Sequence, residues 1–317
     1  MAKLQSQSDN MEKQFDPHRH IRYPRKELPH KVLGRLIVAI FSVASFAASM
    51  AVTSAYAASK TGVLVLANQM LPSGYSTDIY LPRTARLQGG RREDSLPLVV
   101  FLPGAFVDKS QYASVASFIA GAGFVVVIPN PIGLFLEVNT VNDLLDDISI
   151  ADKDPGSPLH KVVDTNTLFV SGHSLGGAIG LYALTGTCAP QICSTFPNYS
   201  APEALIAGAF YGTNLVEAGS LIELDPPASN VIIVQGSNDS IAVTDEAIKT
   251  YSSFATSRAL VEIAGADHYG VCNDPALSPP VTQDPTEGDP DPPLPQAEAN
   301  RRIAFWLATW FKSRLMD

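Results

Sequence analysis

The chain has 317 residues, of which 22 are Lys or Arg and 31 are Asp or Glu, so its formal net charge is −9 at pH 7. An acidic protein of this kind is a poor partner for nucleic acid or for an anionic membrane surface, because both carry negative charge. The length is sufficient for one domain with a sizeable apolar core.

The N-terminal part has the features of an export signal. Basic residues are frequent over 18–35, an apolar run extends from Leu36 to Val52, and Ala55-Tyr56-Ala57 has the Ala-x-Ala pattern of a cleavage site. We interpret residues 1–57 as a signal peptide with a long basic n-region and residues 58–317 as a secreted or periplasmic domain. That domain would keep 14 basic and 27 acidic residues, a formal charge of −13. The alternative is an uncleaved membrane anchor over residues 36–52, although this run falls short of the roughly 20 strongly apolar residues that span a bilayer.

Short apolar segments alternate with helical ones along the rest of the chain, which is the pattern of a mainly parallel sheet covered by helices on both faces. Segments 97–102 and 124–128 are continuously apolar, as strands buried on both faces are. The first two strands precede any helix and should form an antiparallel edge. The predicted fold class is α/β, a single domain with an eight-stranded sheet. Strands are predicted over 62–67, 76–81, 97–102, 124–128, 167–171, 204–210, 230–235 and 259–263, and helices over 109–121, 140–151, 176–186, 242–254 and 297–314.

Two connections between these elements affect access to a site. About 18 residues separate the strand over 204–210 from the strand over 230–235, which is too short for a helical cap domain. We therefore expect no large cap and an open site. Residues 273–296 are rich in Pro and Asp and should form a loop that is ordered at its ends. We interpret this loop as a solvated spacer; the alternative is that it reaches the rim of the site.

The segment Gly172-His173-Ser174-Leu175-Gly176-Gly177 lies between a predicted strand and a predicted helix. A Gly-x-Ser-x-Gly sequence in this context is typical of a nucleophile elbow, in which a sharp, strained turn exposes the serine hydroxyl. The flanking glycines let the strand and the helix approach without Cβ clashes. Ser174 is therefore the candidate nucleophile, and the alternative is a glycine-rich turn without chemistry.

A serine nucleophile needs a base to remove its proton, and the base needs a carboxylate to orient it. Three of the six histidines lie in the leader, His173 is held beside the serine, and His160 lies in a loop before the nucleophile strand. His268 remains, on the loop after the last predicted strand. Asp239 follows the preceding strand, and the order Ser174, Asp239, His268 is the order found in hydrolases with this elbow. Asp225, Asp245 and Asp267 are alternatives for the acid.

Two N–H groups should face the carbonyl oxygen on which negative charge develops during acyl transfer. Leu175 offers one from the start of the helix. Ala105, in Leu102-Pro103-Gly104-Ala105-Phe106, offers the second, with a Pro-Gly turn of no catalytic role as the alternative. Phe106 and Tyr269 are candidates for substrate binding, and Leu134, Phe135 and Tyr211 are further candidates for an apolar pocket, each with core packing as its alternative.

The three cysteines lie in the predicted mature domain. Cys188 and Cys193 flank a short loop with a proline, so a local disulfide is the simplest expectation, and Cys272 could instead pair with one of them. No Cys-x-x-Cys or Cys/His cluster is present in the sequence, so we expect no metal site.

These segments together resemble the single-domain α/β-hydrolases around the chlorophyllases and the bacterial cutinase-like polyester hydrolases. The resemblance implies an α/β-hydrolase fold that cleaves carboxylic esters with a triad at Ser174, His268 and Asp239 and with oxyanion donors at Ala105 and Leu175. This chain has Ala105 where cutinase-like enzymes usually have an aromatic residue, and His173 where they commonly have Trp. The resemblance extends from about Thr77 to His268 and includes Tyr80-Leu81-Pro82, Leu98-Val99-Val100-Phe101-Leu102-Pro103-Gly104, Ala122-Gly123-Phe124-Val125-Val126, Gly172-His173-Ser174-Leu175-Gly176-Gly177 and Gly265-Ala266-Asp267-His268.

The sequence thus predicts an exported serine hydrolase that acts on small-molecule, lipid or polymeric esters through an acyl-enzyme, without a cofactor. An amidase or peptidase with the same triad is one alternative. A binding protein that has the fold without the chemistry is another. The sequence makes no prediction of the acyl-chain length or of the oligomeric state.

Overall fold

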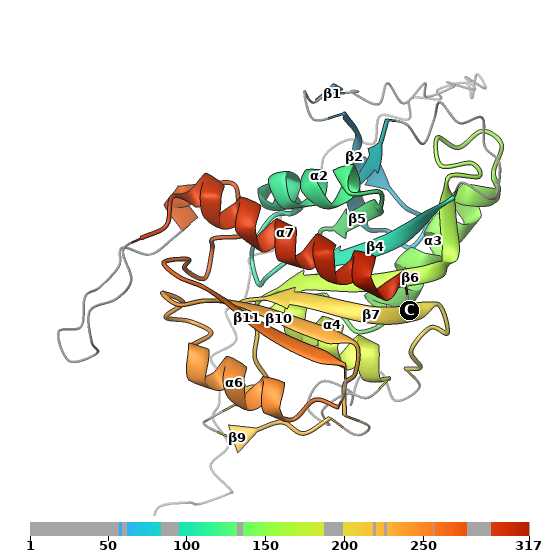
Figure 1. Ribbon diagram of the computed structural model, residues 1–317. Helices are drawn as coiled ribbons and strands as arrows, with labels where there is room; N and C mark the ends of the chain where they lie inside the picture. The colour runs from blue at the N-terminus through green and yellow to red at the C-terminus, as the bar shows by residue number, and fades with distance from the viewer. Residues whose placement is uncertain are drawn as a thin grey trace, which may run out of the picture. The chain divides into compact units, whose positions relative to one another are not determined.

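The computed structural model describes residues 57–58, 62–83, 95–131, 136–186, 199–217, 220–224, 227–255, 257–277 and 293–316 (Figure 1). All of them belong to one compact unit, Val52–Asp317. The leader expected over residues 1–57 lies outside the described residues, apart from Ala57.

The described residues form one main sheet of nine strands in the order β1-β2-β3-β5-β4-β6-β7-β10-β11. The strands from β5 to β11 run parallel, whereas β2 and β3 are antiparallel, as expected for the first two strands. Eight of the strands overlap the predicted ones: β2 (Val63–Met70), β3 (Ser76–Pro82), β4 (Leu96–Leu102), β5 (Val125–Pro129), β6 (Val163–His173), β7 (Leu205–Tyr211), β10 (Val231–Gly236) and β11 (Arg258–Ile263). The ninth strand, β1 (Ala57–Ala58), pairs with β2 and is too short to leave a periodic pattern in the sequence.

Helices cover both faces of this sheet. On one face lie α2 (Ala113–Gly121), which follows the 3₁₀ turn η2 (Lys109–Tyr112), and α7 (Gln296–Arg314). On the other face lie α3 (Thr140–Lys153), α4 (Leu175–Thr185) and α6 (Thr244–Ser252), as Figure 1 shows. The α/β fold class is confirmed. In the part of the chain that the structure describes, none of the helices has the length and apolar character to cross a bilayer.

The continuous apolar sequence of β4 follows from this layering. Val99 and Phe101 pack in the core beneath α2 and α7, whereas Leu98, Val100 and Leu102 pack in the core beneath the other helices. Successive side chains of a strand point to opposite faces, so a strand covered on both sides needs apolar residues at every position.

The connection from β7 to β10 carries a short hairpin, β8 (Val216–Glu217) with β9 (Ser220–Leu221), and its described residues include no helix. This agrees with the expectation that no large cap is inserted there. Residues 273–277, which include the turn η3 (Pro275–Leu277), and residues 293–296 are the described ends of the predicted loop. Both ends are attached to the domain: the Asn273 N–H donates to the Gln111 carbonyl, and the Leu294 N–H donates to the Gly265 carbonyl.

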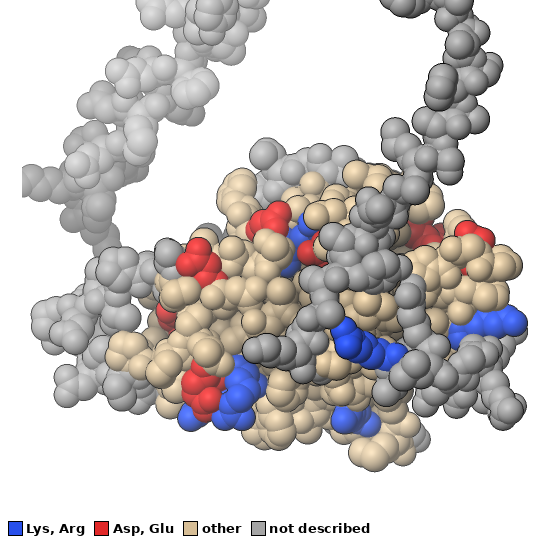
Figure 2. All heavy atoms as spheres, turned by 90° about the horizontal axis from the view of Figure 1, so that it is seen from above, with Lys and Arg blue, Asp and Glu red and all other residues tan. Residues whose placement is uncertain are grey.

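Figure 2 shows the charges on one face of the molecule. The Lys and Arg side chains of the described residues lie there in separate small groups, and several Asp and Glu side chains are present on the same face. A surface that binds nucleic acid carries a basic patch or stripe, and the described part of this face has none. That nucleic acid is not a partner stays a prediction from the charge of the sequence.

Candidate active site

The serine lies at a strained turn between β6 and α4. Ser174 has φ 53° and ψ −125°, a backbone conformation that non-glycine residues rarely adopt. Its N–H donates to the Tyr211 carbonyl over 3.1 Å, and its carbonyl accepts from the Thr213 hydroxyl over 2.9 Å and from the Ala178 N–H over 3.1 Å. The neighbouring strand and the following helix therefore hold the turn in place.

The glycines around Ser174 are required by close backbone contacts. A Cβ on Gly172 would lie 2.7 Å from the Gly176 carbonyl carbon, and a Cβ on Gly176 would lie 2.2 Å from the Leu102 carbonyl oxygen. Because backbone atoms cannot move away as a flexible side chain can, only glycine fits at these two positions. The Gly-x-Ser-x-Gly sequence is thus explained by packing in addition to the turn.

The structure brings the three predicted triad residues into one hydrogen-bonded chain. The His268 Nε2 lies 2.9 Å from the Ser174 Oγ, and the His268 Nδ1 lies 3.0 and 2.9 Å from the two carboxylate oxygens of Asp239. A carboxylate only accepts hydrogen bonds, so Nδ1 carries the proton and Nε2 accepts from the serine hydroxyl. His268 and Asp239 are both buried.

The Asp239 carboxylate is fixed by its own loop. Its Oδ1 accepts from the N–H groups of Ile241, over 3.0 Å, and of Ala242, over 2.7 Å. These bonds leave the carboxylate one orientation, in which it faces the imidazole of His268. A fixed acid in turn fixes the tautomer and the ring plane of the base, which is the arrangement that proton transfer from a serine requires.

The alternative acids and bases have other contacts. The Asp267 carboxylate accepts from the Tyr269 N–H over 3.0 Å, Asp245 lies in the first turn of α6, and Asp225 lies outside the described residues. The His160 Nδ1 lies 3.1 Å from the Asp152 carbonyl oxygen, in the loop before β6. Of the described candidate acids, Asp239 alone forms a hydrogen bond with the His268 imidazole.

The two predicted oxyanion donors line one small apolar depression of about 10 Å³. Leu175 is the first residue of α4, where a helix has no internal partner for its N–H groups. Within the described residues, neither the Ala105 N–H nor the Leu175 N–H donates a hydrogen bond, so both are available to a ligand. The depression is lined by Pro103, Gly104, Ala105, Pro131, Leu136, Leu175 and Ile179.

The predicted substrate-binding residues differ in exposure. Phe106 is 80% exposed directly after Ala105, and Tyr269 is half-buried with its ring edge-on to that of His268, at a centroid distance of 5.2 Å. Tyr211 is fully buried and its hydroxyl donates to the Asp267 carbonyl, so the idea that it lines a pocket is wrong. Its apolar strand places it inside the core, below the site. Leu134 and Phe135 lie outside the described residues.

Two buried polar side chains next to the triad were not assigned a role from the sequence. The His173 Nδ1 lies 3.0 Å from the Tyr112 hydroxyl, and the His173 Nε2 lies 2.8 Å from the His268 carbonyl oxygen. The Gly104 N–H donates to the Tyr112 hydroxyl over 2.8 Å. Tyr112 precedes His173 by 61 residues, and nothing in the local sequence indicates that the two meet.

Cys272 is a buried free thiol, so the structure does not have the alternative disulfide through Cys272. Burial raises the pKa of this thiol to about 12, and its hydrogen bond with Tyr112 acts in the opposite direction. Cys188 and Cys193 lie outside the described residues, and their pairing stays a prediction.

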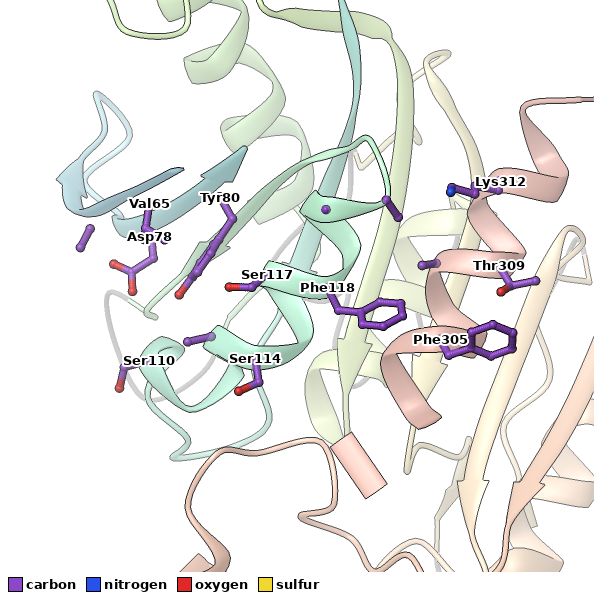
Figure 3. Close-up of a pocket in the computed structure, with 15 residues that line it drawn as sticks. Val65, Asp78, Tyr80, Ser110, Ser114, Ser117, Phe118, Phe305, Thr309 and Lys312 are labelled. Carbon is purple, nitrogen blue, oxygen red and sulfur yellow. The ribbon is translucent and has the colours of Figure 1, made fainter. Parts of the chain in front are cut away.

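A large groove lies away from the triad. It has a volume of about 1080 Å³ and lies between α2, α7 and the strands β2 and β3. Figure 3 shows Phe118 of α2 on the side toward Phe305 of α7, with Asp78 and Tyr80 of β3 at the other end. The described residues that line it include neither histidine nor cysteine, and no triad residue is among them.

Comparison with known proteins identifies the family. No curated protein matches the chain. The model of the alpha/beta hydrolase family matches residues 98–273, which is more than half of the chain and spans β4 to the loop that carries His268. The matched region contains Ser174, Asp239 and His268. The chain therefore belongs to the alpha/beta hydrolase family.

Proposed function

We propose that this protein is a serine hydrolase that cleaves carboxylic esters through a covalent acyl-enzyme. The observation that carries the proposal is the hydrogen-bonded chain from the Ser174 hydroxyl through the His268 imidazole to the Asp239 carboxylate. A nucleophile, a base and an orienting acid within hydrogen-bond distance are the components that acyl transfer needs.

In the proposed reaction, the Ser174 Oγ attacks the ester carbonyl while the His268 Nε2 takes the hydroxyl proton. The imidazolium then gives this proton to the departing alcohol, which leaves the acyl group on Ser174. A water molecule, deprotonated by His268, attacks the acyl-enzyme, and the serine recovers its proton as the acid is released. Asp239 keeps its charge throughout and stabilises the imidazolium.

The N–H groups of Ala105 and Leu175 would receive the negative charge of each tetrahedral intermediate. Support comes from their common position beside the small depression and from their lack of other acceptors among the described residues. The positive end of α4 adds to the field at this point. One such donor contributes roughly 3 kcal/mol to the stability of the transition state in serine hydrolases.

Exposed apolar side chains on the loops that carry the site support the proposal that the substrates are esters with apolar groups. Phe106 follows the proposed donor Ala105, and Ile241 and Val243 follow the acid Asp239; these three apolar side chains are exposed. Apolar side chains at the rim of a site remove acyl or alcohol chains from water. The ester class and the chlorophyllase-like or cutinase-like subtype rest on the resemblance of the sequence and belong to this proposal.

We further propose that the enzyme is exported, on the basis of the basic, apolar and Ala-x-Ala segments of residues 1–57. Cleavage after Ala57 would cut between the two residues of β1. N-terminal sequencing of the protein recovered outside the cytoplasm should begin at Ala58. An intact N-terminus in a membrane fraction would favour the anchor over residues 36–52.

The test of the proposed function is the hydrolysis of p-nitrophenyl esters with acyl chains from C2 to C16, beside p-nitroanilides of the same acids. Ser174→Ala and His268→Ala should lose the ester activity, and Ser174→Ala should lose labelling by a fluorophosphonate. Ser171→Ala is the matched control, because Ser171 is a buried serine of β6 whose hydroxyl donates to the Ala209 carbonyl.

The possible outcomes separate the alternatives. Anilide turnover above ester turnover would indicate an amidase or peptidase. A folded protein that neither turns over an ester nor reacts with the fluorophosphonate would be a binding protein with this fold, and the proposal would be wrong.

A further inference from the structure

The contacts of Tyr112 and His173 connect the loop that carries Ala105 with the loop that carries His268. The chain of hydrogen bonds runs from the Gly104 N–H to the Tyr112 hydroxyl, over 2.8 Å, and from there to the His173 Nδ1, over 3.0 Å. It continues from the His173 Nε2 to the His268 carbonyl oxygen over 2.8 Å. Tyr112 and His173 are both fully buried, so water does not compete for these bonds.

The partners of His173 determine where its proton lies. A carbonyl oxygen only accepts, so the His173 Nε2 carries the proton and donates it to the His268 carbonyl. A neutral imidazole then has an unprotonated Nδ1, which must accept from the Tyr112 hydroxyl. Burial lowers the pKa of His173 well below 6.5, so the ring is neutral at neutral pH, and burial raises the pKa of Tyr112, so the hydroxyl keeps its proton.

The hydrogen of the Tyr112 hydroxyl therefore points to the His173 Nδ1. The hydroxyl donates to His173 and therefore acts as an acceptor toward the Gly104 N–H. The thiol of Cys272 is a further hydrogen-bonding neighbour of the same oxygen. Each polar atom in the chain from Gly104 to His268 thus has one role, and the two loops are joined without a water molecule.

The ring of His173 also sets the position of the Gly104 loop by contact. A Cβ on Gly104 would lie 2.7 Å from the His173 Nδ1, so the loop backbone packs directly on the imidazole. The ring also contacts that of His268, at a centroid distance of 4.7 Å. A residue that touches both loops controls how far apart they lie.

We propose that Tyr112 and His173 are positioning residues that set the distance between the oxyanion donor at Ala105 and the base His268. The proposal rests on the proposed function, because it assigns these two loops their roles in acyl transfer. Neither residue touches the substrate or exchanges a proton with it. Their effect is on the transition state, in which the base and the oxyanion donors must both be correctly placed around one substrate carbonyl group.

The first test removes one hydroxyl group. Tyr112→Phe keeps the ring and its packing on Phe101 but leaves the Gly104 N–H and the His173 Nδ1 without their partner. We expect kcat for a p-nitrophenyl ester to fall by about 10- to 100-fold with KM within twofold, since a shift of about 1 Å between reacting groups costs on the order of 10²-fold.

Tyr75→Phe is the matched control. Tyr75 is also buried, and its hydroxyl contacts the hydroxyl of Thr140 in α3 over 3.0 Å, in the core on the opposite face of the sheet from Tyr112. The two variants should lose similar thermal stability, but Tyr75→Phe should keep kcat within twofold of the wild type. Equal kcat values for Tyr112→Phe and Tyr75→Phe would overturn the proposal, as would a Tyr112→Phe variant that changes KM alone.

Substitutions of His173 test the two ends of the connection separately. In His173→Gln the amide nitrogen can reach the position of Nε2 and donate to the His268 carbonyl, whereas in His173→Asn the amide oxygen can take the place of Nδ1 and accept from Tyr112. His173→Phe keeps neither bond. We expect kcat to be lowest for His173→Phe and higher for both amides; a Phe variant as active as the amide variants would contradict the proposal.

Two measurements keep this test separate from that of the ester function. If the wild type cleaves no ester, the rate of its labelling by a fluorophosphonate replaces kcat, because phosphonylation of Ser174 needs the same base and oxyanion donors. The ¹⁵N chemical shifts of His173 need no reaction: they should show Nε2 protonated and Nδ1 unprotonated. A proton on Nδ1 would overturn the proposal whatever the protein hydrolyses.

Discussion

The elbow around Ser174 and the groove between α2 and α7 differ in cavity volume and in chemistry. The groove measures about 1080 Å³, whereas the depression that Ala105 and Leu175 line measures about 10 Å³. At the elbow, however, the His268 imidazole lies 2.9 Å from the Ser174 hydroxyl on one side and 2.9 and 3.0 Å from the Asp239 carboxylate oxygens on the other. Reactivity follows from polar groups that converge on one point, and the size of a cavity does not predict it.

The charged groups of the two regions are used differently. In the groove, the Asp78 carboxylate accepts from the Asn68 N–H over 2.8 Å and pairs with the Lys109 ammonium over 3.3 Å, so its charge is compensated within the fold. At the elbow, the Asp239 carboxylate faces an imidazole that gains a proton during the proposed reaction. The first arrangement balances two buried charges inside the fold, and the second is suited to stabilise a transition state.

The largest difference should appear when each carboxylate is replaced by an amide. Asp239→Asn should lower kcat by roughly 10⁴-fold, because an amide N–H toward Nδ1 favours the imidazole tautomer that cannot accept the serine proton. Asp78→Asn should keep kcat within twofold but destabilise the protein by about 3 kcal/mol, because Lys109 is left buried without its counter-charge. Ester kinetics and urea unfolding of both variants test this prediction, and similar effects of the two on kcat would contradict it.

Replacing a glycine by alanine should change the unfolding free energy in opposite directions in the two regions. A Cβ on Gly176 would lie 2.2 Å from the Leu102 carbonyl oxygen, so Gly176→Ala should cost more than about 3 kcal/mol of unfolding free energy. A Cβ on Gly121, which lines the groove at the end of α2, has its nearest neighbour 3.9 Å away, on Val63. Gly121→Ala should therefore stabilise the helix by about 0.5 kcal/mol. Urea midpoints that move in the same direction would refute the distinction.

Acid should destabilise the elbow through His173. Burial holds the pKa of His173 well below 6.5 in the folded protein, so the unfolded chain binds more protons once the pH falls below about 6.5. The contribution of His173 to stability is therefore present above pH 6.5 and lost below it, by up to about 1.4 kcal/mol for each pH unit. Between pH 6.5 and 5, unfolding free energies of His173→Phe should have the smaller slope, while Tyr75→Phe should keep that of the wild type. Equal slopes for all three proteins would contradict this assignment.

The smallest effects are expected in the groove. Phe118 and Phe305 are 38% and 47% exposed, so Phe118→Ser and Phe305→Ser should change the unfolding free energy by less than about 1 kcal/mol. Ester kcat and KM should stay within twofold of the wild type. A tenfold rise in KM for either variant would show that the groove takes part in substrate binding, and the two regions would then share one function.

The order of the elements was predictable because each leaves a local pattern. The apolar runs of β4 and β5 indicate strands buried on both faces, and the order Ser174, Asp239, His268 follows from positions after successive strands. Parallel strands place their carboxyl ends at one edge of the sheet, so loops that follow different strands meet there. Chain order and strand positions alone therefore predict that the three candidate residues lie close together.

Other features depend on contacts between distant segments. Tyr211 is an aromatic residue at the end of a strand near the site, and only the packing of α7 against its face of the sheet shows that it is buried. The state of Cys272 likewise follows from its burial beside Tyr112 and not from the spacing of the cysteines. The local sequence does not determine whether such a residue is buried or exposed to solvent.

By itself, the sequence determined the succession of strands and helices, the elbow at Ser174 and the residue types of the site, since these depend on periodicity, glycine spacing and chain order. Only the tertiary structure decided the tautomer of His268, the burial of Tyr211 and the connection from Gly104 through Tyr112 and His173. The physical reason is that a hydrogen bond depends on where two atoms lie to within a few tenths of an ångström. That position is fixed by the packing of the whole domain and not by any segment of the chain.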